Sequence, residues 1–349
     1  MKLIIPMAGR GTRVRPHSHV TPKPLLPVCG KSMVERIVDT FSAVLPRPIT
    51  EAVFVLGPDF GQEVRDSLTD ICERHGAKAH FATQDVALGT AHAVGCAGDH
   101  LEGEGIMVFA DTLFYMDPGV DLTDADVVAW VKHVEDPSRF GVAVRDGDRI
   151  VELVEKPQEL ISTEALIGIY YCREFKQLRS AIQYLFDNNI TGVGDEYQLT
   201  DAFDLMLKDD KVFKTTTVTE WLDCGTIEAL SETTEVILRM ENHSADIEGM
   251  TIHNPVYVGP GVTVEGGEIG PFVSIEAGST IRNSTVSHSI VFGDALVEDS
   301  ELEGSLVGHH AQVKSFEGSL NVGDHSEVKG TRLQASSLQP NQIVAVAIH

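Results

Sequence analysis

Cysteine and basic residues are both scarce in this chain of 349 residues. The five cysteines lie far apart and form no C-x-x-C pair, which argues against a disulfide framework or a thiolate metal site and favours a reducing compartment. Lys and Arg number 27 against 52 Asp and Glu, a formal charge of −25. The chain therefore lacks the basic footprint of a nucleic-acid-binding protein.

Long apolar runs are absent as well. No stretch reaches the ~18 apolar residues of a membrane-spanning helix, and the opening MKLIIPMA breaks into Gly and Arg too soon for the core of a signal peptide. Hydrophobic content of 42% argues against a disordered chain, and the length leaves room for two domains. We expect a soluble, cytoplasmic protein that binds neither nucleic acid nor membrane.

The few basic residues are unevenly placed. Residues 1–34 contain six of them and no acid, so this segment carries +6 and the remainder −31. One interpretation is a docking site for an anion, and the other is a solvated basic surface, the usual meaning of a charge run. The six residues are Lys2, Arg10, Arg13, Arg15, Lys23 and Lys31.

Short apolar runs alternate with helix-length segments in the first third of the chain. The runs, typical of buried strands, are 3–7, 51–57, 77–83 and 105–111, and the segments between them are 32–45, 59–74 and 89–97. This alternation predicts an α/β fold with a Rossmann-like, mostly parallel sheet and helices on both faces. Such sheets bind ligands at the carboxyl ends of their strands.

The pattern changes after residue 126. Strand-like runs at 126–131, 140–144, 149–154 and 166–171 precede apolar residues at helical spacing over 175–186 and 199–206, and a last helix at 226–240. The polar stretch that follows predicts a domain boundary. We therefore expect a catalytic domain over residues 1–240 and a second domain over 241–349.

The second domain contains hexapeptide repeats. Its aliphatic residues recur mostly every five or six positions, followed by Gly or an acid, as in VGPGVT and IGPFVS. This repeat predicts a left-handed parallel β-helix, in which each turn stacks its aliphatic residues on the next. The stacked residues are expected to be Val258, Val264, Ile269, Ile275, Ile281, Leu296, Leu302, Val307 and Val313.

A glycine-rich loop directly follows the first predicted strand. Gly9 and Gly11 can turn successive amides inward around a phosphate, although a tight turn would explain these glycines alone. Arg13 adds a fork of donors and Lys23 a point charge. The loop matches neither G-x-x-x-x-G-K-[ST] nor G-x-G-x-x-G, which disfavours a kinase or a dehydrogenase.

Several ordered motifs continue this loop along the chain. They are GRGTRVRP (9–16) with Pro22-Lys23, Gln84 with LGTA (88–91), Asp111 at the end of the fourth strand, FGV (140–142), EKP (155–157) and WLDCGT (221–226). Together they resemble the sugar-1-phosphate nucleotidylyltransferase family, and the β-helix tail makes the chain similar to long-form glucose-1-phosphate thymidylyltransferases. The resemblance implies that a sugar-1-phosphate, expected to be glucose-1-phosphate, attacks a nucleoside triphosphate, expected to be dTTP. A nucleotide sugar and pyrophosphate would be formed.

The resemblance also implies roles for individual residues. The catalytic residues would be Arg13 and Lys23, and Mg²⁺ would be held by Asp111 and Asp223. The sugar phosphate would be bound by Gly141, Glu155 and Lys156. The nucleotide would be bound by Ala8, Gly9, Gly11, Thr12, Gln84 and Gly89. Each position also has a structural explanation. The aspartates could cap turns, Glu155 and Lys156 could end an exposed strand, and Gly89 could start a helix.

The chain departs from the family pattern at three places. Ala8 replaces a common glycine, Ala-Asp-Thr at 110–112 replaces Gly-Asp-Asn, and Gly194 stands where an arginine often contacts the sugar phosphate. UDP-glucose or GDP-mannose synthesis therefore stays open, as does an acyltransferase activity in the β-helix, where His309 and His310 lie. We expect the β-helix to mediate a homo-oligomer.

The charge distribution predicts how activity responds to salt. A strongly acidic surface repels anionic substrates in dilute buffer, and at 1 M salt screening acts within about 3 Å. We expect activity to be sustained or to rise as KCl is raised from dilute buffer toward molar concentration, measured as initial rates at fixed substrate concentrations. Activity that is highest in dilute buffer and falls steadily with added salt would contradict this expectation.

Overall fold

The computed structural model describes residues 1–9 and 11–330. Its contacts divide the chain into two compact units, the first made of Met1–Pro27 and Lys31–Thr233, the second of Val28–Gly30 and the chain from Thr234 onward. Each unit has its own sheets and its own apolar core. In the described part of the chain, no helix is long and apolar enough to cross a membrane.

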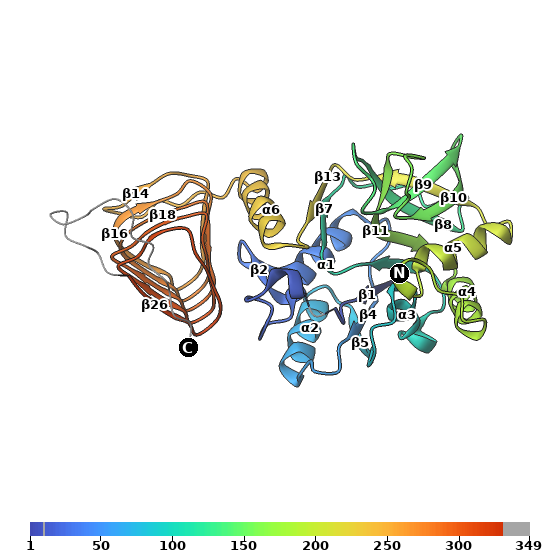
Figure 1. Cartoon of the computed structure of the whole chain (residues 1–349), viewed down its shortest axis with the longest axis horizontal. Coiled ribbons are helices and arrows are strands. Elements are labelled where there is room, and N and C mark those ends of the chain that lie inside the picture. The colour runs from blue at the N-terminus through green and yellow to red at the C-terminus, as the bar shows by residue number, and fades with distance from the viewer. Residues whose placement is uncertain (10, 331–349) are drawn as a thin grey trace. The chain divides into compact units, whose positions relative to one another are not determined.

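The first unit is built on a nine-stranded sheet with the order β5-β4-β1-β6-β11-β8-β12-β10-β9 (Figure 1). Its strands are β1 (Lys2–Pro6), β4 (Glu51–Leu56), β5 (Lys78–Thr83), β6 (Gly105–Val108), β8 (Val127–His133), β9 (Gly141–Asp146), β10 (Arg149–Glu155), β11 (Glu164–Cys172) and β12 (Phe213–Thr217). Two small sheets accompany it. They pair β2 (Pro27–Val28) with β3 (Lys31–Ser32), and β7 (Thr112–Tyr115) with β13 (Glu220–Asp223).

The prediction of a parallel sheet holds for one part of this sheet. Strands β5, β4, β1 and β6 pair in parallel, as does β12 with β8. Strand β11 is antiparallel to β6, β8 and β9, and β10 is antiparallel to β9 and β12. The sheet is thus mixed: β9 and β10 form a hairpin, and β11 enters antiparallel between β6 and β8.

Helices cover both faces of the sheet. One face carries Ile4, Val53 and Met107, which share a core with α3 (Thr90–Gly95), α4 (Phe175–Asp187) and α5 (Leu199–Lys208). Side chains alternate along a strand, so Phe54 and Phe81 stack on the opposite face, where Arg65 of α2 lies over Phe81. Helix α1 (Met33–Val44) contacts α2 (Gln62–Arg74). Short 3₁₀ turns are η1 (Thr12–Val14), η2 (Lys23–Leu25), η3 (Gly98–His100) and η4 (Val193–Asp195).

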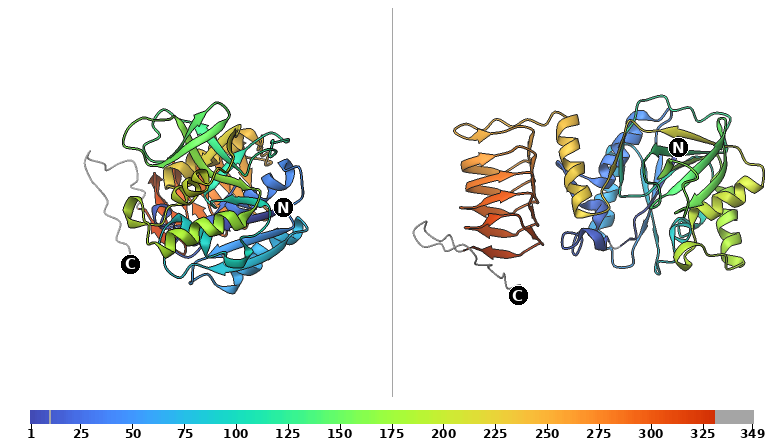
Figure 2. Two further views of the ribbon diagram at one scale, coloured as in Figure 1. Left: turned by 90° about the vertical axis from the view of Figure 1, so that its right-hand side faces the viewer. Right: turned by 45° about the horizontal axis from the view of Figure 1, so that its top comes forward.

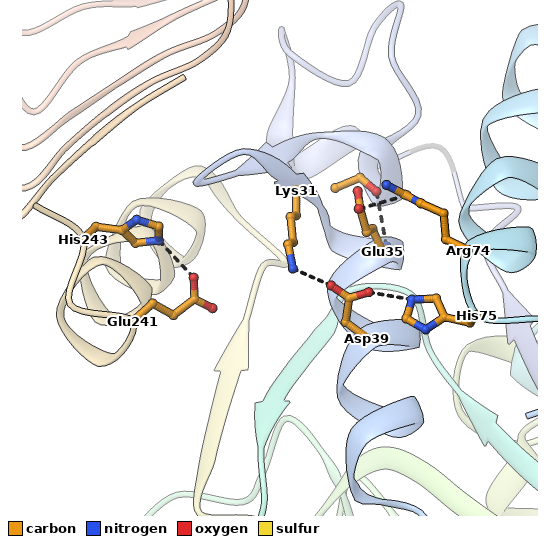
Figure 3. Close-up of polar contacts among 8 residues, drawn as sticks. Lys31, Glu35, Asp39, Arg74, His75, Glu241 and His243 are labelled. Atoms are coloured by element: carbon orange, nitrogen blue, oxygen red, sulfur yellow. Dashed lines mark hydrogen bonds and ion pairs between the residues drawn. The ribbon is translucent and has the colours of Figure 1, made fainter. Parts of the chain in front are cut away.

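Polar contacts tie α1 to the end of α2. Ser32 caps α1 by accepting from the Glu35 amide at 3.2 Å. Asp39 accepts from Lys31 at 2.6 Å and pairs with His75 at 2.7 Å, and Glu35 pairs with Arg74 at 2.9 Å (Figure 3). These side chains are partly exposed, so the pairs fix orientation more than they add stability.

The second unit consists of stacked parallel strands preceded by α6 (Ile227–Met240), within which the division between the units falls (Figure 2). One sheet holds β14 (Thr251–Ile252), β16 (Thr263–Ile269), β18 (Thr280–Ser287), β20 (Leu296–Glu298), β21 (Glu301–Glu303), β23 (Gln312–Lys314), β24 (Glu317–Gly318) and β26 (Glu327–Lys329). The other holds β15 (Val256–Val258), β17 (Val273–Ile275), β19 (Ser289–Val291), β22 (Leu306–Val307) and β25 (Asn321–Val322). All of these pairings are parallel, which is consistent with the predicted β-helix.

The repeat places one aliphatic residue of each coil above the next. Successive partners in the first sheet lie 15 to 17 residues apart. Val264, Ile281, Val297, Val313 and Val328 stack in this register, four of them buried and Val264 partly buried. The prediction that Leu296 belongs to the stack is wrong, because the register turns Val297 inward and Leu296 toward the surface.

Candidate active site

A cavity of about 390 Å³ opens at the carboxyl ends of the parallel strands of the first unit. Ala8 and Gly9 follow β1, Gln84 follows β5, and Asp111 closely follows β6. The predicted residues that line the cavity are Ala8, Gly9, Gly11, Thr12, Arg13, Lys23, Gln84, Gly89 and Asp111. The fold therefore brings together two of the predicted groups, the nucleotide-binding and the catalytic residues, from segments far apart in the sequence.

Gly11 holds the glycine-rich loop against Lys23. Gly11 has φ +57°, and a Cβ there would lie 2.7 Å from the Cβ of Lys23. The Ser18 hydroxyl donates to the Gly11 carbonyl at 2.6 Å. Gly9 is different, since its φ is not in the left-handed region and a Cβ there would meet nothing within 4 Å. Only Gly11 is thus required by the conformation of the loop itself.

Lys23 and Asp111 form the strongest polar contact of the cavity. Lys23 Nζ lies 2.7 Å from Asp111 Oδ2, with the lysine side chain 8% exposed and the aspartate side chain 38% exposed. A nearly buried ammonium needs such a partner, because an unpaired charge is costly to remove from water. The pair fixes the lysine and leaves the carboxylate accessible to a ligand.

Asp223 lies beside Asp111 because of one strand pairing. Strands β7 and β13 are antiparallel with Asp223 opposite Thr112, and the Cys224 amide donates to the Asp111 carbonyl at 3.2 Å. Asp223 Oδ1 accepts from the Gly225 amide at 2.8 Å, and its side chain is exposed. Both carboxylates are hard oxygen donors with accessible oxygens, a donor set that suits Mg²⁺. The chemistry of this pair therefore fits the predicted metal.

Gln84 is held by a histidine that the motif analysis did not select. Gln84 Nε2 donates to His92 Nδ1 at 2.9 Å, and Gln84 is buried. Burial lowers the pKa of His92, so its ring is neutral near pH 7 and can accept this hydrogen bond. His92 lies in α3 and belongs to none of the sequence motifs, so the sequence did not indicate a role for it. The contact orients the Gln84 amide toward the cavity.

Gly89 has two structural constraints in addition to lining the cavity. Gly89 is the N-cap of α3 and has φ +114°, a backbone conformation that favours glycine. The structural explanation, that this glycine starts a helix, therefore applies. A Cβ at Gly89 would also lie 2.5 Å from the Tyr197 carbonyl oxygen. The segment that carries Tyr197 also contributes Glu196 to the lining, a residue that the sequence analysis did not assign.

The predicted sugar-phosphate residues form a separate group, which does not line the cavity. Gly141 is opposite Glu155 in the pairing of β9 with β10, and a Cβ at Gly141 would lie 2.9 Å from Glu155 Oε2. Thr200 Oγ1 donates to the same carboxylate at 3.4 Å, and Lys156 is exposed. Burial raises the pKa of Glu155, which the neighbouring Lys156 and Thr200 only partly offset.

An aromatic contact connects this group with the strand that carries Asp223. The rings of Phe140 and Trp221 meet edge to face with centroids 5.1 Å apart. Phe140 precedes Gly141, and Trp221 lies two residues before Asp223. The two histidines considered for acyl transfer, His309 and His310, lie in the second unit. The ring of His309 stacks on Phe292 with centroids 5.4 Å apart, and that of His310 on His325 with centroids 4.9 Å apart.

A glycine loop, a nearly buried lysine and Asp111 at the carboxyl ends of the parallel strands, with Asp223 on the adjoining strand β13, form a site that suits an anionic ligand such as a nucleotide. The sequence profile described as Nucleotidyl transferase matches residues 2–239, and the chain belongs to this family. The family resemblance of the motifs is thereby confirmed.

Three curated relatives cover nearly the whole chain. The Low-salt glycan biosynthesis nucleotidyltransferase Agl11 of Haloferax volcanii is 28% identical, over 94% of this chain and 100% of its own length. Glucose-1-phosphate thymidylyltransferase of Streptomyces antibioticus is 29% identical, over 94% of this chain and 99% of its own. Bifunctional protein GlmU of Listeria innocua is 28% identical, over 93% of this chain and 70% of its own.

A solved structure shares the fold. It is a putative glucose-1-phosphate thymidylyltransferase from Bacillus anthracis in complex with a sucrose, with a TM-score of 0.55 and 24% identity. The match covers 67% of this chain and 94% of that chain.

The geometry at Gly11 predicts a difference between two glycine substitutions. Gly11→Ala forces a side chain into the left-handed region, at about 1–2 kcal/mol, and against Lys23, so Tm should fall by about 2–8 °C. Gly9→Ala is the matched control and should leave Tm nearly unchanged. Thermal unfolding followed by circular dichroism checks both, and equal Tm values for the two variants would contradict the role of Gly11.

The environment of Glu155 predicts a pH-dependent gain from Glu155→Gln. The pKa of Glu155 is raised above 4.5 in the folded protein. Above that raised pKa the ionised carboxylate lowers the free energy of unfolding, because the folded protein binds the proton more tightly than the unfolded chain does. The loss of stability disappears at lower pH, where Glu155 is protonated in both the folded and the unfolded protein. Glu155→Gln should therefore raise the free energy of unfolding at pH 7 and change it much less near pH 4.5. Urea unfolding at both pH values measures this, with the exposed Glu159→Gln as control. A Glu155→Gln variant whose free energy of unfolding falls more at pH 7 than at pH 4.5 would contradict this prediction.

Proposed function

We propose that this protein transfers a nucleotidyl group from a nucleoside triphosphate, dTTP in the first instance, to a sugar-1-phosphate such as glucose-1-phosphate. The products are a nucleotide sugar and pyrophosphate. The observation that carries the proposal is the pairing of β7 with β13, which sets Asp223 opposite Thr112 and so beside the segment of Asp111, whose carboxylate pairs with Lys23 at the cavity. The relatives named as glucose-1-phosphate thymidylyltransferases support the choice of substrates.

Arg13 and Lys23 are the proposed catalytic residues. In the reaction an oxygen of the sugar phosphate forms a bond to the α-phosphorus while the bond to pyrophosphate breaks, so negative charge builds on the leaving group. Arg13 is exposed at the cavity and can hold the triphosphate with its fork of donors. Lys23, fixed by Asp111, reduces the repulsion between the two anionic substrates.

Asp111 and Asp223 would hold Mg²⁺. When bound, the cation supplies charge neutralisation for the triphosphate and the leaving pyrophosphate. The 2.7 Å contact between Lys23 and Asp111 couples the cation site to the catalytic lysine. The amide of Gly225 helps to orient Asp223 for this task.

The nucleotide would lie along the glycine loop and Gln84. Backbone groups of Ala8, Gly9, Gly11 and Thr12 line one part of the cavity and are placed to contact phosphate and base. With one amide proton of Gln84 engaged by His92, its carbonyl oxygen and second amide proton can pair with the N3–H and a carbonyl of a pyrimidine. Thymine and uracil both present this edge, so UTP is the competing nucleotide.

The sugar phosphate would bind at the group of Gly141, Glu155 and Lys156. The absence of a Cβ at Gly141 accommodates the Glu155 carboxylate, which can accept from sugar hydroxyls, and the exposed Lys156 can reach a phosphate. The packing of Phe140 on Trp221 joins this group to the strand of Asp223. Synthesis of UDP-glucose or GDP-mannose is the alternative within this site.

Residues 1–240 are the proposed catalytic domain, and residues 241–349 the proposed left-handed β-helix domain, with assembly of a homo-oligomer as its role. Within the described residues the stack of coils has β14 at one end and β26 at the other, and strands at the edge of a sheet can pair with another chain. His309 stacks on Phe292 and His310 on His325, and neither ring contact favours the alternative of acyl transfer.

A pyrophosphate-release assay tests the proposed reaction. dTTP and the four common ribonucleoside triphosphates are crossed with a panel of sugar-1-phosphates at saturating Mg²⁺. We expect pyrophosphate release to be fastest with dTTP and glucose-1-phosphate. Release with another pair would reassign the substrates, and no release with any pair would refute the function.

The same assay examines Asp223. Asp223→Asn removes a ligand charge and should lower kcat by about 100-fold while the fold is retained. The control is Asp148→Asn, whose carboxylate is 78% exposed in a turn of the same unit. Turnover of Asp223→Asn equal to that of the control would show that Asp223 does not hold the metal.

A further inference from the structure

A second cluster of potential metal ligands lies away from the cavity. Glu51, His80 and His100 each offer one donor atom, and these three atoms lie within 4.8 Å of one another. His80 Nε2 is 3.6 Å from Glu51 Oε2, and the two imidazole rings have centroids 4.7 Å apart. In the described residues, this is the only group of three or more His, Cys, Asp or Glu side chains with such spacing.

The nitrogen of His80 that faces the cluster has no hydrogen bond. Nε2 of His80 is buried and unsatisfied among the described residues, and the carboxylate at 3.6 Å is too far to accept from it. A buried polar atom without a partner is costly and calls for an explanation.

The backbone holds the three ligands in place. Glu51 begins β4 and His80 lies within β5, and the parallel pairing of these strands puts Glu51 opposite Lys78, on the same face as His80. His100 is the last residue of η3. The ammonium of Lys2 holds this turn in place by donating to the carbonyl oxygens of His100 at 2.8 Å and of Glu102 at 3.2 Å. The donor atoms thus come from three anchored segments.

We propose that Glu51, His80 and His100 form a site for a divalent transition metal of the zinc type, distinct from the proposed Mg²⁺ site. Two imidazoles and one carboxylate suit Zn²⁺, Co²⁺ or Ni²⁺ rather than Mg²⁺, and they leave a fourth position for water. Ligand atoms of a tetrahedral zinc site lie about 3.4 Å apart. Binding of the metal would draw the three donor atoms from the present spacing of up to 4.8 Å to that value.

Charges around the cluster moderate its affinity. Lys2 Nζ is 3.9 Å from Glu51 Oε2, and Lys78 is on the neighbouring strand, so two ammonium groups oppose the cation. The negative charge of the chain acts in the other direction. A bound metal would join η3 to β4 and β5 at the amino-terminal end of β4, whereas the cavity lies at the carboxyl ends.

Metal titration of the full chain tests the site. The protein, freed of metal by chelation, is titrated with Zn²⁺ in excess Mg²⁺ by calorimetry, and with Co²⁺ followed by the visible absorption of tetrahedral cobalt. We expect His80→Ala/His100→Ala to lose one equivalent of binding, or at least about 100-fold in affinity, together with the cobalt band. The control is His133→Ala/His253→Ala, which removes two exposed histidines elsewhere and should bind like the wild type.

The outcomes are separable from those of the catalytic proposal. Zn²⁺ should raise the Tm of the wild type and of the control, and not that of the cluster variant. Equal binding by all three proteins, or no binding by the wild type, would overturn the site. If the double variant does not fold, Glu51→Gln and His100→Gln replace it, because Gln has the shape of Glu and is a polar side chain of similar size to His. Mg²⁺-dependent pyrophosphate release should be unchanged in these variants, and its loss would show that the cluster is not separate from catalysis.

Discussion

The antiparallel pairing of β7 with β13 is the contact on which the candidate active site depends. It joins two segments of four residues each, and it sets Asp223 next to the backbone of Asp111. Two carboxylates on neighbouring segments favour a cation beside them, because each carries a negative charge. The ammonium of Lys23 meets part of that need at 2.7 Å from Asp111, and a bound divalent cation would meet the rest.

The lysine in turn depends on the glycine loop. A nearly buried Lys23 side chain passes so close to Gly11 that the loop has no room for a Cβ at that position. The basic residues of the first 34 positions therefore act through different geometries, since Lys23 is fixed inside the cavity while Arg13 is exposed at its wall. An anionic substrate explains this arrangement better than a solvated basic surface does, because a solvated lysine side chain would not be nearly buried against a carboxylate.

Much of the first unit was predictable from apolar spacing. The helices expected at 32–45 and 226–240 are found at Met33–Val44 and Ile227–Met240, because their apolar stripes are regular and α1 has a capping serine. Strands β7, β12 and β13 were missed. They are only four or five residues long, and β12 is the polar segment FKTTT, which pairs with β8 although it has no apolar alternation. Such short strands are stabilised by pairing with a neighbouring strand, so their own sequences do not indicate a strand.

The sequence by itself determined the family, the glycine loop with Arg13 and Lys23, and the repeat of the second unit, because each is a local pattern of residue types at short spacing. Only the tertiary structure decided which distant residues meet. It placed His92 on Gln84, Glu196 at the cavity, and Val297 rather than Leu296 inside the coil stack. It also assembled Glu51, His80 and His100 from three segments. Such contacts depend on strand register and on long-range packing, which spacing along the chain does not encode.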